Sequence, residues 1–323
     1  MNRMFGPLAA MILTAFMAAP AAAQTYPTKL IRFVVPYAPG GVADIAARVV
    51  GQKLTEAWGQ QIVVENRPGG NGFIGVTTVT KATPDGYTFL VATLGDLTIN
   101  PVIFKEIPYD VQRDLVPVTT LTDTPCVFAV YAGAPYKTMA DVIADAKARP
   151  GKIAVATPGN GSVNQLIMEW IGLEIGTKFL HIPYKGGAPA AASLAGGDLP
   201  AGILAVSSAM PHVKSGRVRV LAITTEKRSS INPEWPTLEE SGVANVHATN
   251  WTGLLAPKST PPAIVEKLHA EVVKILDMPD VKDRLAVGGA TTIPSSAADF
   301  DARVKSETAA FKVIVQKANI QPE

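Results

Sequence analysis

Apolar residues follow two different spacings along the chain. Short apolar runs, typical of buried strands, alternate with stretches in which apolar residues recur at i, i+3, i+4 and i+7, the spacing of an amphipathic helix. In the first third of the chain this pattern predicts strands over residues 30–35, 62–65 and 87–93, and a helix over residues 42–58. Strands that alternate with helices are typical of a mostly parallel sheet, so we predict an α/β fold.

A second unit with the same order of elements begins near Thr122. Thr138 and Asp141 have the spacing of a capping box at the start of a helix that Pro150 and Gly151 end. The remaining predictions are strands over residues 153–156, 179–182, 202–206 and 218–224, a helix after the loop 157–162, and C-terminal helices from about residues 260 and 296 that could cover either unit.

The first 23 residues have the pattern of a secretory signal. Arg3 precedes an apolar stretch over residues 8–19, and Pro20 separates that stretch from three alanines that end at Ala23. A retained anchor would require ~20 unbroken apolar residues, which this segment does not supply. No later stretch reaches that length, so we predict cleavage after Ala23 and release into a bacterial periplasm.

Composition and charge further limit the class of protein. The 323 residues are 47% hydrophobic and 17% charged, with 29 basic and 27 acidic residues and a formal net charge of +2. This balance excludes a disordered polyelectrolyte and gives no electrostatic footprint for nucleic acid. At roughly 100 to 200 residues per domain, the length suits two domains. Cys126 is the only cysteine, which excludes an internal disulfide and a thiolate zinc site; we expect a buried small hydrophobe there rather than a reactive thiol.

Two patterns associated with enzymes are weak in this chain. Residues 70–75 fit G-x-G-x-x-G, and Asp96 lies 21 positions beyond Gly75, near the spacing of a dinucleotide site. An exported protein meets little NAD, however, and this match is not in the opening strand–helix unit. The four histidines, which include His181 in a strand-like segment, are isolated, with no H-E-x-x-H or G-x-S-x-G motif. We therefore predict no enzyme, no cofactor and no metal, with His181 as a structural residue.

Glycine-rich loops that open helices are the remaining candidate site. The first N–H groups of a helix lack intrahelical acceptors, and the helix dipole adds partial positive charge there, so such loops can hold an anion without a buried cation. One such loop contains Gly40 and Gly41, and another spans residues 158–162. Each loop alone would be a mere connection, whereas one in each unit of an exported protein favours a cleft for a small anion.

Six segments together resemble the Bug family, the periplasmic solute receptors of tripartite tricarboxylate transporters. They are VVPYAPGGVAD (34–44), VENRPG (64–69), PDGYT (84–88), GNGS (159–162), IPYKG (182–186) and LLAP (254–257), in an ordered similarity that covers residues 26–320. The resemblance implies a type II periplasmic-binding (Venus flytrap) fold with the ligand cleft between two domains. The first domain would combine residues 24–122 with 249–323, and the second would be residues 123–248.

The resemblance also implies a site for a carboxylate, held chiefly by backbone N–H groups and ordered water. The implied partners are a small organic carboxylate and membrane permease subunits, with the receptor acting as a monomer and without nucleic acid. The candidate ligand-binding residues are Tyr37, Pro39, Gly40, Gly41, Val42, Ala43, Asp44, Asp96, Thr157, Gly159, Asn160, Gly161, Ser162, Tyr184, Lys185, Leu204 and Val206.

The chain departs from the family pattern where side chains would face the ligand. Val42 and Ala43 stand where relatives usually include a hydroxyl residue, and Leu204 and Val206 lie in a segment where relatives commonly have Asp or Asn. An unpaired buried polar group costs ~1 to 3 kcal/mol, so these residues argue against citrate and amino acids. They favour an acid with an aromatic or aliphatic body.

The sequence leaves alternatives for the roles of two charged candidate residues and for the function of the protein. Asp44 at a helix start would organise the loop or position water, because it would repel an anionic ligand. Lys185 is either a ligand counter-charge or a solvated surface residue. Besides transport, the sequence allows a receptor that presents its ligand to a membrane sensor and, third, a periplasmic hydrolase.

Overall fold

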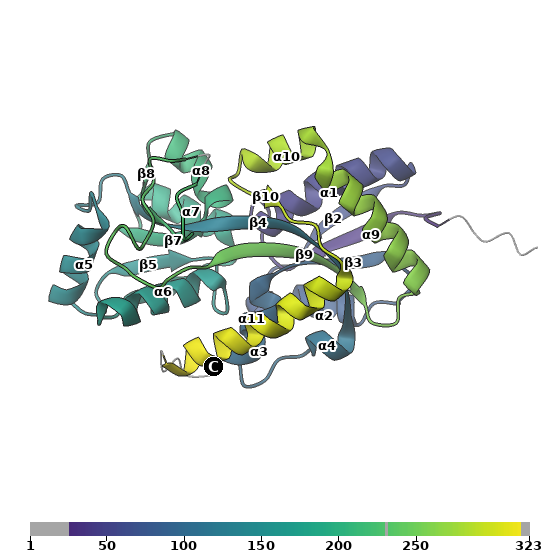
Figure 1. Cartoon of the computed structure of the whole chain (residues 1–323), viewed down its shortest axis with the longest axis horizontal. Helices are drawn as coiled ribbons and strands as arrows, with labels where there is room; N and C mark the ends of the chain where they lie inside the picture. The colour runs from purple at the N-terminus through teal and green to yellow at the C-terminus, as the bar shows by residue number, and fades with distance from the viewer. Residues whose placement is uncertain (1–25, 230–231, 318–323) are drawn as a thin grey trace, which may run out of the picture.

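The structure consists of two lobes joined by two long strands. The computed structural model describes residues 26–229 and 232–317. Figure 1 shows the lobes side by side, bridged by β4 (Leu115–Tyr131) and β9 (Thr249–Pro257). The predicted signal segment and its cleavage position lie outside the described residues. Within them, no helix is both long enough and apolar enough to cross a membrane.

The first lobe is a sheet in the order β2-β1-β3-β9-β4. Its first three strands are parallel, β9 is antiparallel to both neighbours, and a short β10 pairs with β4. These strands are β1 (Ile31–Val35), β2 (Ile62–Asn66), β3 (Thr88–Thr93) and β10 (Thr291–Thr292). The N-terminal helical elements are α1 (Val42–Trp58), η1 (Gly70–Gly72), α2 (Phe73–Thr80), η2 (Gly95–Ile99), α3 (Asn100–Ile103) and α4 (Val111–Asp114).

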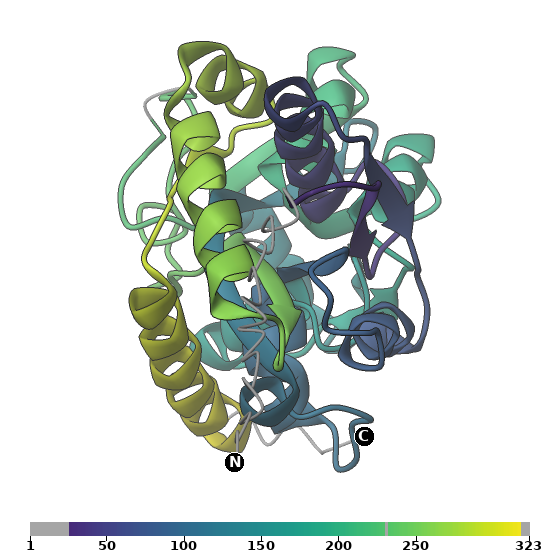
Figure 2. The same ribbon diagram turned by 90° about the vertical axis from the view of Figure 1, so that its right-hand side faces the viewer.

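The C-terminal helices all pack on the first lobe. They are α9 (Pro262–Asp277), α10 (Pro279–Ala286) and α11 (Ala297–Lys317). Both α9 and α10 contact α1, while α11 contacts β4, η2 and α3. Figure 2 shows α9 and α11 following one another along one side of this lobe. The sequence left open which unit the C-terminal helices cover. In their described part, they cover the first lobe.

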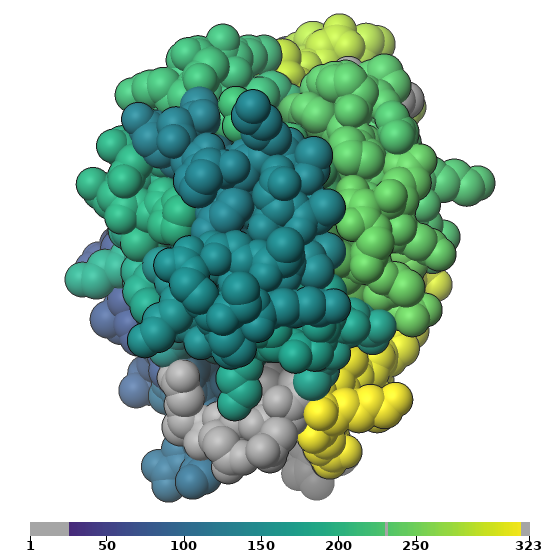
Figure 3. Space-filling model, turned by 90° about the vertical axis from the view of Figure 1, so that its left-hand side faces the viewer, coloured from purple at the N-terminus to yellow at the C-terminus, as the bar shows by residue number. Residues whose placement is uncertain are grey.

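The second lobe is a sheet in which the end of β4 pairs with β7 and β8, and β5 lies between β7 and β6. Its strands are β5 (Ala154–Thr157), β6 (Leu180–Pro183), β7 (Ala201–Ala205) and β8 (Val218–Ile223). Its helices are α5 (Met139–Ala148), α6 (Val163–Ile175), α7 (Gly187–Gly196) and α8 (Val206–Lys214). Figure 3 views the molecule from the outer end of this lobe, with α11 at the edge of the view.

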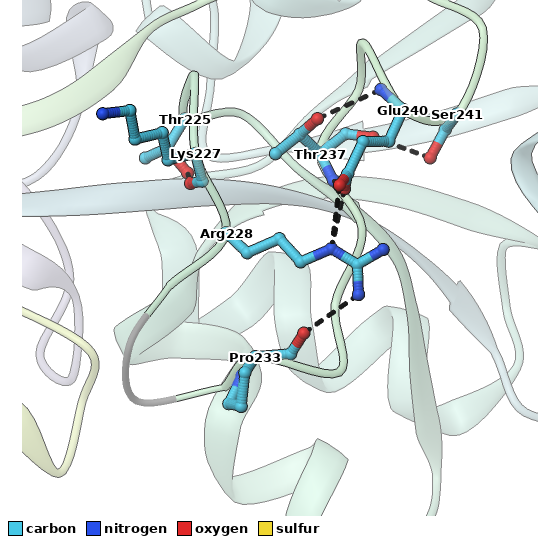
Figure 4. Close-up of polar contacts among 7 residues, drawn as sticks. All are labelled: Thr225, Lys227, Arg228, Pro233, Thr237, Glu240 and Ser241. Atoms are coloured by element: carbon cyan, nitrogen blue, oxygen red, sulfur yellow. Dashed lines mark hydrogen bonds and ion pairs between the residues drawn. The ribbon is translucent and has the colours of Figure 1, made fainter.

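An irregular segment links β8 to β9 and is held by its own polar contacts. Arg228 donates from Nε to Glu240 Oε2 at 2.8 Å and from Nη1 to the carbonyl of Pro233 at 3.1 Å, as Figure 4 shows. The same carboxylate oxygen of Glu240 accepts from the backbone N–H of Thr237 at 2.8 Å. These bonds hold the segment in place of the backbone hydrogen bonds that a regular strand would form, and the chain then enters β9.

Strand β4 changes partners along its length, which is how one strand serves both lobes. Residues from Leu115 to Pro125 pair with β9, and residues from Cys126 onward pair with β7 and β8. The change falls directly after Pro125, a residue without an N–H to donate to a ladder.

Most predicted elements are present within one or two residues of their predicted bounds. The helix over residues 42–58 is confirmed, as is the capping box of Thr138 and Asp141. Cys126 is fully buried. The strand predicted over 202–206 was wrong at its end, because it stops at Ala205 and Val206 begins α8. The sequence analysis did not predict α7 or α8.

Candidate functional site

A cavity of about 30 Å³ lies where the two lobes meet. The lobes contact each other beside it, since a Cβ on Gly40 of the first lobe would lie 3.2 Å from the Cβ of Ala188 in the second. A direct hydrogen bond also joins them, from the backbone N–H of Ala38 to the carbonyl of Lys185 at 3.3 Å. The cavity is lined by Tyr37, Gly41, Val42, Ala43, Thr93, Pro158, Ser162, Val163, Asn164, Gly187, Ala205, Ser208 and Asn250.

Helix N-termini dominate this lining. Of the helices in the described chain, α1, α6, α7 and α8 begin at the cavity, and each contributes residues from its cap or first turn. The N-cap residues of α1, α7 and α8 are Gly41, Gly186 and Ala205, which make no side-chain capping bond. Because glycine and alanine carry no capping oxygen, the first N–H groups of these helices remain free for another acceptor.

The positive charge at the cavity comes from helix dipoles and not from charged side chains. None of the described residues that line the cavity is a lysine, an arginine or a histidine. Each helix N-terminus carries the equivalent of about half a positive charge, which favours an anion. The arrangement is suited to a small carboxylate held by backbone N–H groups.

The loop between β1 and α1, which we call the first loop (residues 36–41), is fixed by Asp44. This buried carboxylate accepts hydrogen bonds from the N–H of Gly40 at 2.8 Å, from Arg48 Nε at 3.0 Å and from Asn66 Nδ2 at 2.9 Å. Asn66 Nδ2 also donates to the carbonyl of Tyr37 at 3.0 Å. Burial alone would raise the pKa of Asp44, but the bonds from Arg48, Gly40 and Asn66 lower it below its ordinary value.

A second buried carboxylate, Asp96, lies behind the cavity and not in its lining. It accepts from the N–H of Thr93 at 2.8 Å, from Thr93 Oγ1 at 3.0 Å and from the hydroxyl of Tyr37 at 3.1 Å. Burial raises its pKa to about 6, although these hydrogen bonds oppose the increase. Burial also raises the pKa of Tyr37 well above its ordinary value. Asp96 thus contacts two of the lining side chains.

Three buried polar atoms in the lining have no partner among the described residues. They are Asn164 Oδ1, Ser208 Oγ and Asn250 Oδ1. A buried polar group without a hydrogen bond costs ~1 to 3 kcal/mol, and such groups are rare in native structures. Their convergence on one cavity indicates a site for a polar molecule.

A wider groove of about 230 Å³ lies beside the cavity and shares Tyr37 and Pro158 with it. Several predicted residues line this groove instead: Gly159, Asn160, Tyr184 and Lys185. Lys185 is exposed, and Tyr184 donates or accepts a hydrogen bond of 2.5 Å with Ser193 Oγ.

The other predicted site residues fall into distinct places. Of the predicted set, the cavity lining includes Tyr37, Gly41, Val42, Ala43 and Ser162. Pro39 and Gly40 are exposed on the first loop, Gly161 donates its N–H to Gln165 Oε1 at 2.8 Å, and Thr157 bonds to His181 Nε2 at 2.6 Å.

Leu204 and Val206 do not line the cavity, which corrects the reasoning about an apolar wall. Leu204 is fully buried in the core of the second lobe, opposite Val127 of β4. Val206 packs against Gly289 of the first lobe, so closely that a Cβ on that glycine would overlap it. Polar side chains that the sequence analysis missed occupy the lining instead: Thr93, Asn164, Ser208 and Asn250.

The two patterns associated with enzymes have structural explanations. A Cβ on Gly75 would lie 2.6 Å from the Cα of Pro36, and the backbone of Gly72 packs against Asp96 with φ at +89°, so these glycines allow close packing. The pKa of His181 is lowered to about 4 by burial. The described residues contain no cluster of three or more histidine, cysteine or acidic side chains that could hold a metal.

The fold and the site define a two-lobe solute-binding protein with an anion site between the lobes. Residues 46–320 match the family model described as the tripartite tricarboxylate transporter family receptor. The chain therefore belongs to this family, whose members are periplasmic solute-binding receptors and not enzymes. It is 37% identical over 294 residues to BugT of Bordetella pertussis, covering 91% of this chain and 90% of BugT.

Solved structures give the same class. Rpa4515 of R. palustris, solved with adipate, has a TM-score of 0.90 at 32% identity and covers 92% of this chain and 100% of its own. MatC of Rhodopseudomonas palustris, solved with malate, has a TM-score of 0.85 at 29% identity and covers 90% of this chain and 100% of its own.

Proposed function

We propose that this protein captures a small organic carboxylate between its lobes and presents it to the membrane permease subunits of a tripartite transporter. The observation that carries the proposal is the convergence of four helix N-termini, among the described helices, on one cavity without a cationic side chain. The first loop and the start of α1 would hold the carboxylate. Relatives solved with adipate and malate support this class of ligand.

We propose further that the ligand carries a second polar group. Asn164, Ser208 and Asn250 supply polar atoms without partners opposite the start of α1. A ligand with one carboxylate and an apolar body would leave them unsatisfied, at a cost of ~1 to 3 kcal/mol each. The expectation of an apolar acid was argued partly from Leu204 and Val206, whereas the lining that supports it consists of Val42, Ala43, Val163 and Ala205.

The cleft would widen to admit such a ligand, because the two lobes contact each other beside the cavity through the hydrogen bond from Ala38 to Lys185. The predicted domain boundaries at 122/123 and 248/249 place the hinge in β4 and β9. The change of partners in β4 after Pro125 supports a hinge there. Action as a monomer in the periplasm, after cleavage behind Ala23, completes the proposal.

Calorimetry with purified mature protein tests the ligand class. Adipate, malate, citrate and benzoate would be titrated at one pH and one salt concentration, with thermal unfolding as a second readout. We expect adipate or malate to bind in the micromolar range and to raise the unfolding temperature, since a ligand at 100 times its Kd adds ~2.7 kcal/mol of stability. Tight benzoate binding without a response to dicarboxylates would favour the apolar acid. No binding by any carboxylate would refute the proposal.

A further inference from the structure

Asp96 contacts the two hydroxyl side chains that the first lobe contributes to the cavity. Its Oδ2 accepts from both the N–H and the hydroxyl of Thr93, and its Oδ1 accepts from the hydroxyl of Tyr37. Tyr37 and Thr93 also lie 3.3 Å apart, hydroxyl to hydroxyl. The side chains of Tyr37 and Thr93 therefore lie between the Asp96 carboxylate and any molecule in the cavity.

The protonation state of Asp96 decides which way these hydroxyl groups point. An ionised carboxylate can only accept, and each hydroxyl has a single proton to donate. When Asp96 is ionised, the hydroxyl groups of Tyr37 and Thr93 both donate their hydrogen bonds to it. They then present only lone pairs to the cavity. Lone pairs repel a carboxylate ligand, and so does the charge of Asp96 itself.

The surroundings of Asp96 contain little that would stabilise its charge. Its exposed fraction is 0%, and the backbone of Gly72 packs directly against Oδ1. Among the described residues, the donors to its carboxylate are the N–H and hydroxyl of Thr93 and the hydroxyl of Tyr37, none of which is charged. The titratable groups that face it are Tyr37 and Tyr109, whose hydroxyl donates to the Asp96 carbonyl at 2.7 Å.

The described residues of the neighbouring elements form no ion pair with Asp96. Helix α2 and the turn η1 contain no titratable residue. Helix α11 packs against η2, and its Glu307 is bonded to Arg303 at 2.8 Å and to Trp251 Nε1 at 2.7 Å. Burial accordingly raises the pKa of Asp96 to about 6, although its hydrogen bonds oppose the increase.

We propose that Asp96 is a positioning residue that couples carboxylate binding to the uptake of one proton, a coupling that rests on the proposed function. The proton comes from solvent and binds Oδ1, because Oδ2 is held by the N–H of Thr93. Asp96 then donates to the oxygen of Tyr37, and the Tyr37 hydroxyl proton turns toward the ligand carboxylate. The only covalent bond formed is the O–H bond between the solvent proton and Oδ1, and the Tyr37 O–H bond rotates without breaking. The cavity gains one donor, and the charge of Asp96 behind it is neutralised.

The sign of the coupling follows from this exchange. A bound carboxylate disfavours the ionised form of Asp96, so ligand binding raises the pKa of Asp96 further. By linkage, the protein binds its ligand more tightly as the pH falls toward 6. We expect the Kd of adipate to decrease about tenfold between pH 8 and pH 6, as for a group whose pKa rises by a little more than one unit on binding.

Carbon-13 NMR of aspartate-labelled protein tests the proton directly. In the ligand-free wild type, one carboxyl resonance that is absent from Asp96→Asn should titrate between about pH 5 and pH 7. Addition of adipate should move this midpoint upward. A resonance that stays ionised down to pH 4.5, or a midpoint that adipate leaves in place, would overturn the proposal. The ligand-free titration reports on Asp96 even if the proposed ligand class is wrong.

Calorimetry at pH 6 and pH 8, in buffers of different ionisation enthalpy, tests the coupling. Asp96→Asn keeps an acceptor for Thr93 and presents a permanent donor to Tyr37, so it should bind adipate equally at both pH values and should take up no proton. Because the variant meets the same adipate, it also corrects for titration of the ligand. Tyr37→Phe should reduce the pH dependence to the part that the charge of Asp96 causes directly, while Asp96 still titrates.

Tyr109→Phe is the matched control, since Tyr109 contacts the backbone of Asp96 but not its carboxylate or the cavity. It should retain the tenfold pH dependence. A wild-type Kd that is the same at both pH values, or a pH dependence that persists in Asp96→Asn, would refute the coupling. If neither adipate nor malate binds at any pH, the proposed function fails instead, and the ligand-free titration alone decides the state of Asp96.

Discussion

The two walls of the cavity are built in opposite ways. On the first lobe, the loop before α1 is tied down by Asp44, Arg48 and Asn66, and the side chains Tyr37 and Thr93 are bonded to Asp96. The second lobe presents the starts of α6, α7 and α8, where Asn164 and Ser208 keep polar atoms without partners. Apart from Asn250 of β9, whose Oδ1 also lacks a partner, the polar side chains of the first wall are bonded within the protein, whereas Asn164 and Ser208 of the second wall are not fully bonded.

This difference separates two tasks in recognition. A wall that is fixed before binding loses little conformational entropy when the ligand binds, so it suits a carboxylate group, which the adipate and malate of the two solved relatives share. A wall with unpaired atoms discriminates between ligands, because a ligand that leaves them unpaired loses ~1 to 3 kcal/mol at each. The first lobe would then give affinity, and the second would give specificity.

Replacing Gly41 tests the first wall with the largest expected effect. Gly41 has φ at −82° and ψ at 172°, an extended conformation open to any residue, so the obstacle is space. A Cβ there would lie 3.9 Å from the N–H of Gly187 across the cavity, in ordinary contact. Gly41→Val should weaken adipate binding at least about a hundredfold, ~2.8 kcal/mol, by calorimetry. Gly41→Ala is the control and should lose much less; equal affinity of both variants and wild type would place the carboxylate elsewhere.

Asp44→Ala should lower both stability and affinity, because the N–H of Gly40 and the amide of Asn66 lose their acceptor. We expect the free energy of unfolding to fall by ~2 kcal/mol near neutral pH. The pKa of Asp44 is lowered in the folded state, so its contribution is present above about pH 3.8 and is lost as the pH falls through its folded pKa. Urea unfolding at several pH values checks this, and a difference that grows on acidification would contradict it.

Ser208→Ala should separate stability from affinity on the second wall. Removing an unpaired buried hydroxyl should stabilise the ligand-free protein slightly and weaken binding about tenfold, ~1.4 kcal/mol. Ser207→Ala is a matched control, because Ser207 on the same helix also has an unpaired buried hydroxyl but does not line the cavity. It should stabilise without changing affinity. Loss of stability in Ser208→Ala with unchanged binding would show that this hydroxyl serves the fold.

Lys185→Ala should have the smallest effect. The side chain is exposed and lines the outer groove, whereas its backbone carbonyl accepts from Ala38 whatever side chain is present. Exposed charges contribute little, so we expect a change in Kd of about threefold or less. A loss of a hundredfold by calorimetry would make Lys185 the counter-charge that the sequence left as an alternative.

The sequence predicted the first wall better than the second for physical reasons. The first loop has a local signature, since glycine and proline precede a regular amphipathic helix. Helix α7 is rich in alanine and glycine and has little apolar periodicity, whereas α8 has only nine residues and contains Pro211, a residue that usually ends or kinks a helix. Strand β7 is buried on both faces, which leaves no alternation to show whether Leu204 points inward or toward the cavity.

Asn250 shows a different limit of prediction. It lies in β9, which pairs with β3 and β4 and is separated in sequence from every other part of the lining. No local pattern marks it, and only the folded chain brings it opposite the starts of the helices. That an atom is unpaired is likewise a property of the assembled cavity and not of any segment.

A site made of helix dipoles has a consequence for release. A guanidinium or ammonium group would keep attracting the anion after the lobes part, and its attraction would weaken as salt is added. The N-termini on the two walls act together only while they face each other, and water replaces the ligand at each N–H once they separate. Opening by itself would therefore release the bound carboxylate.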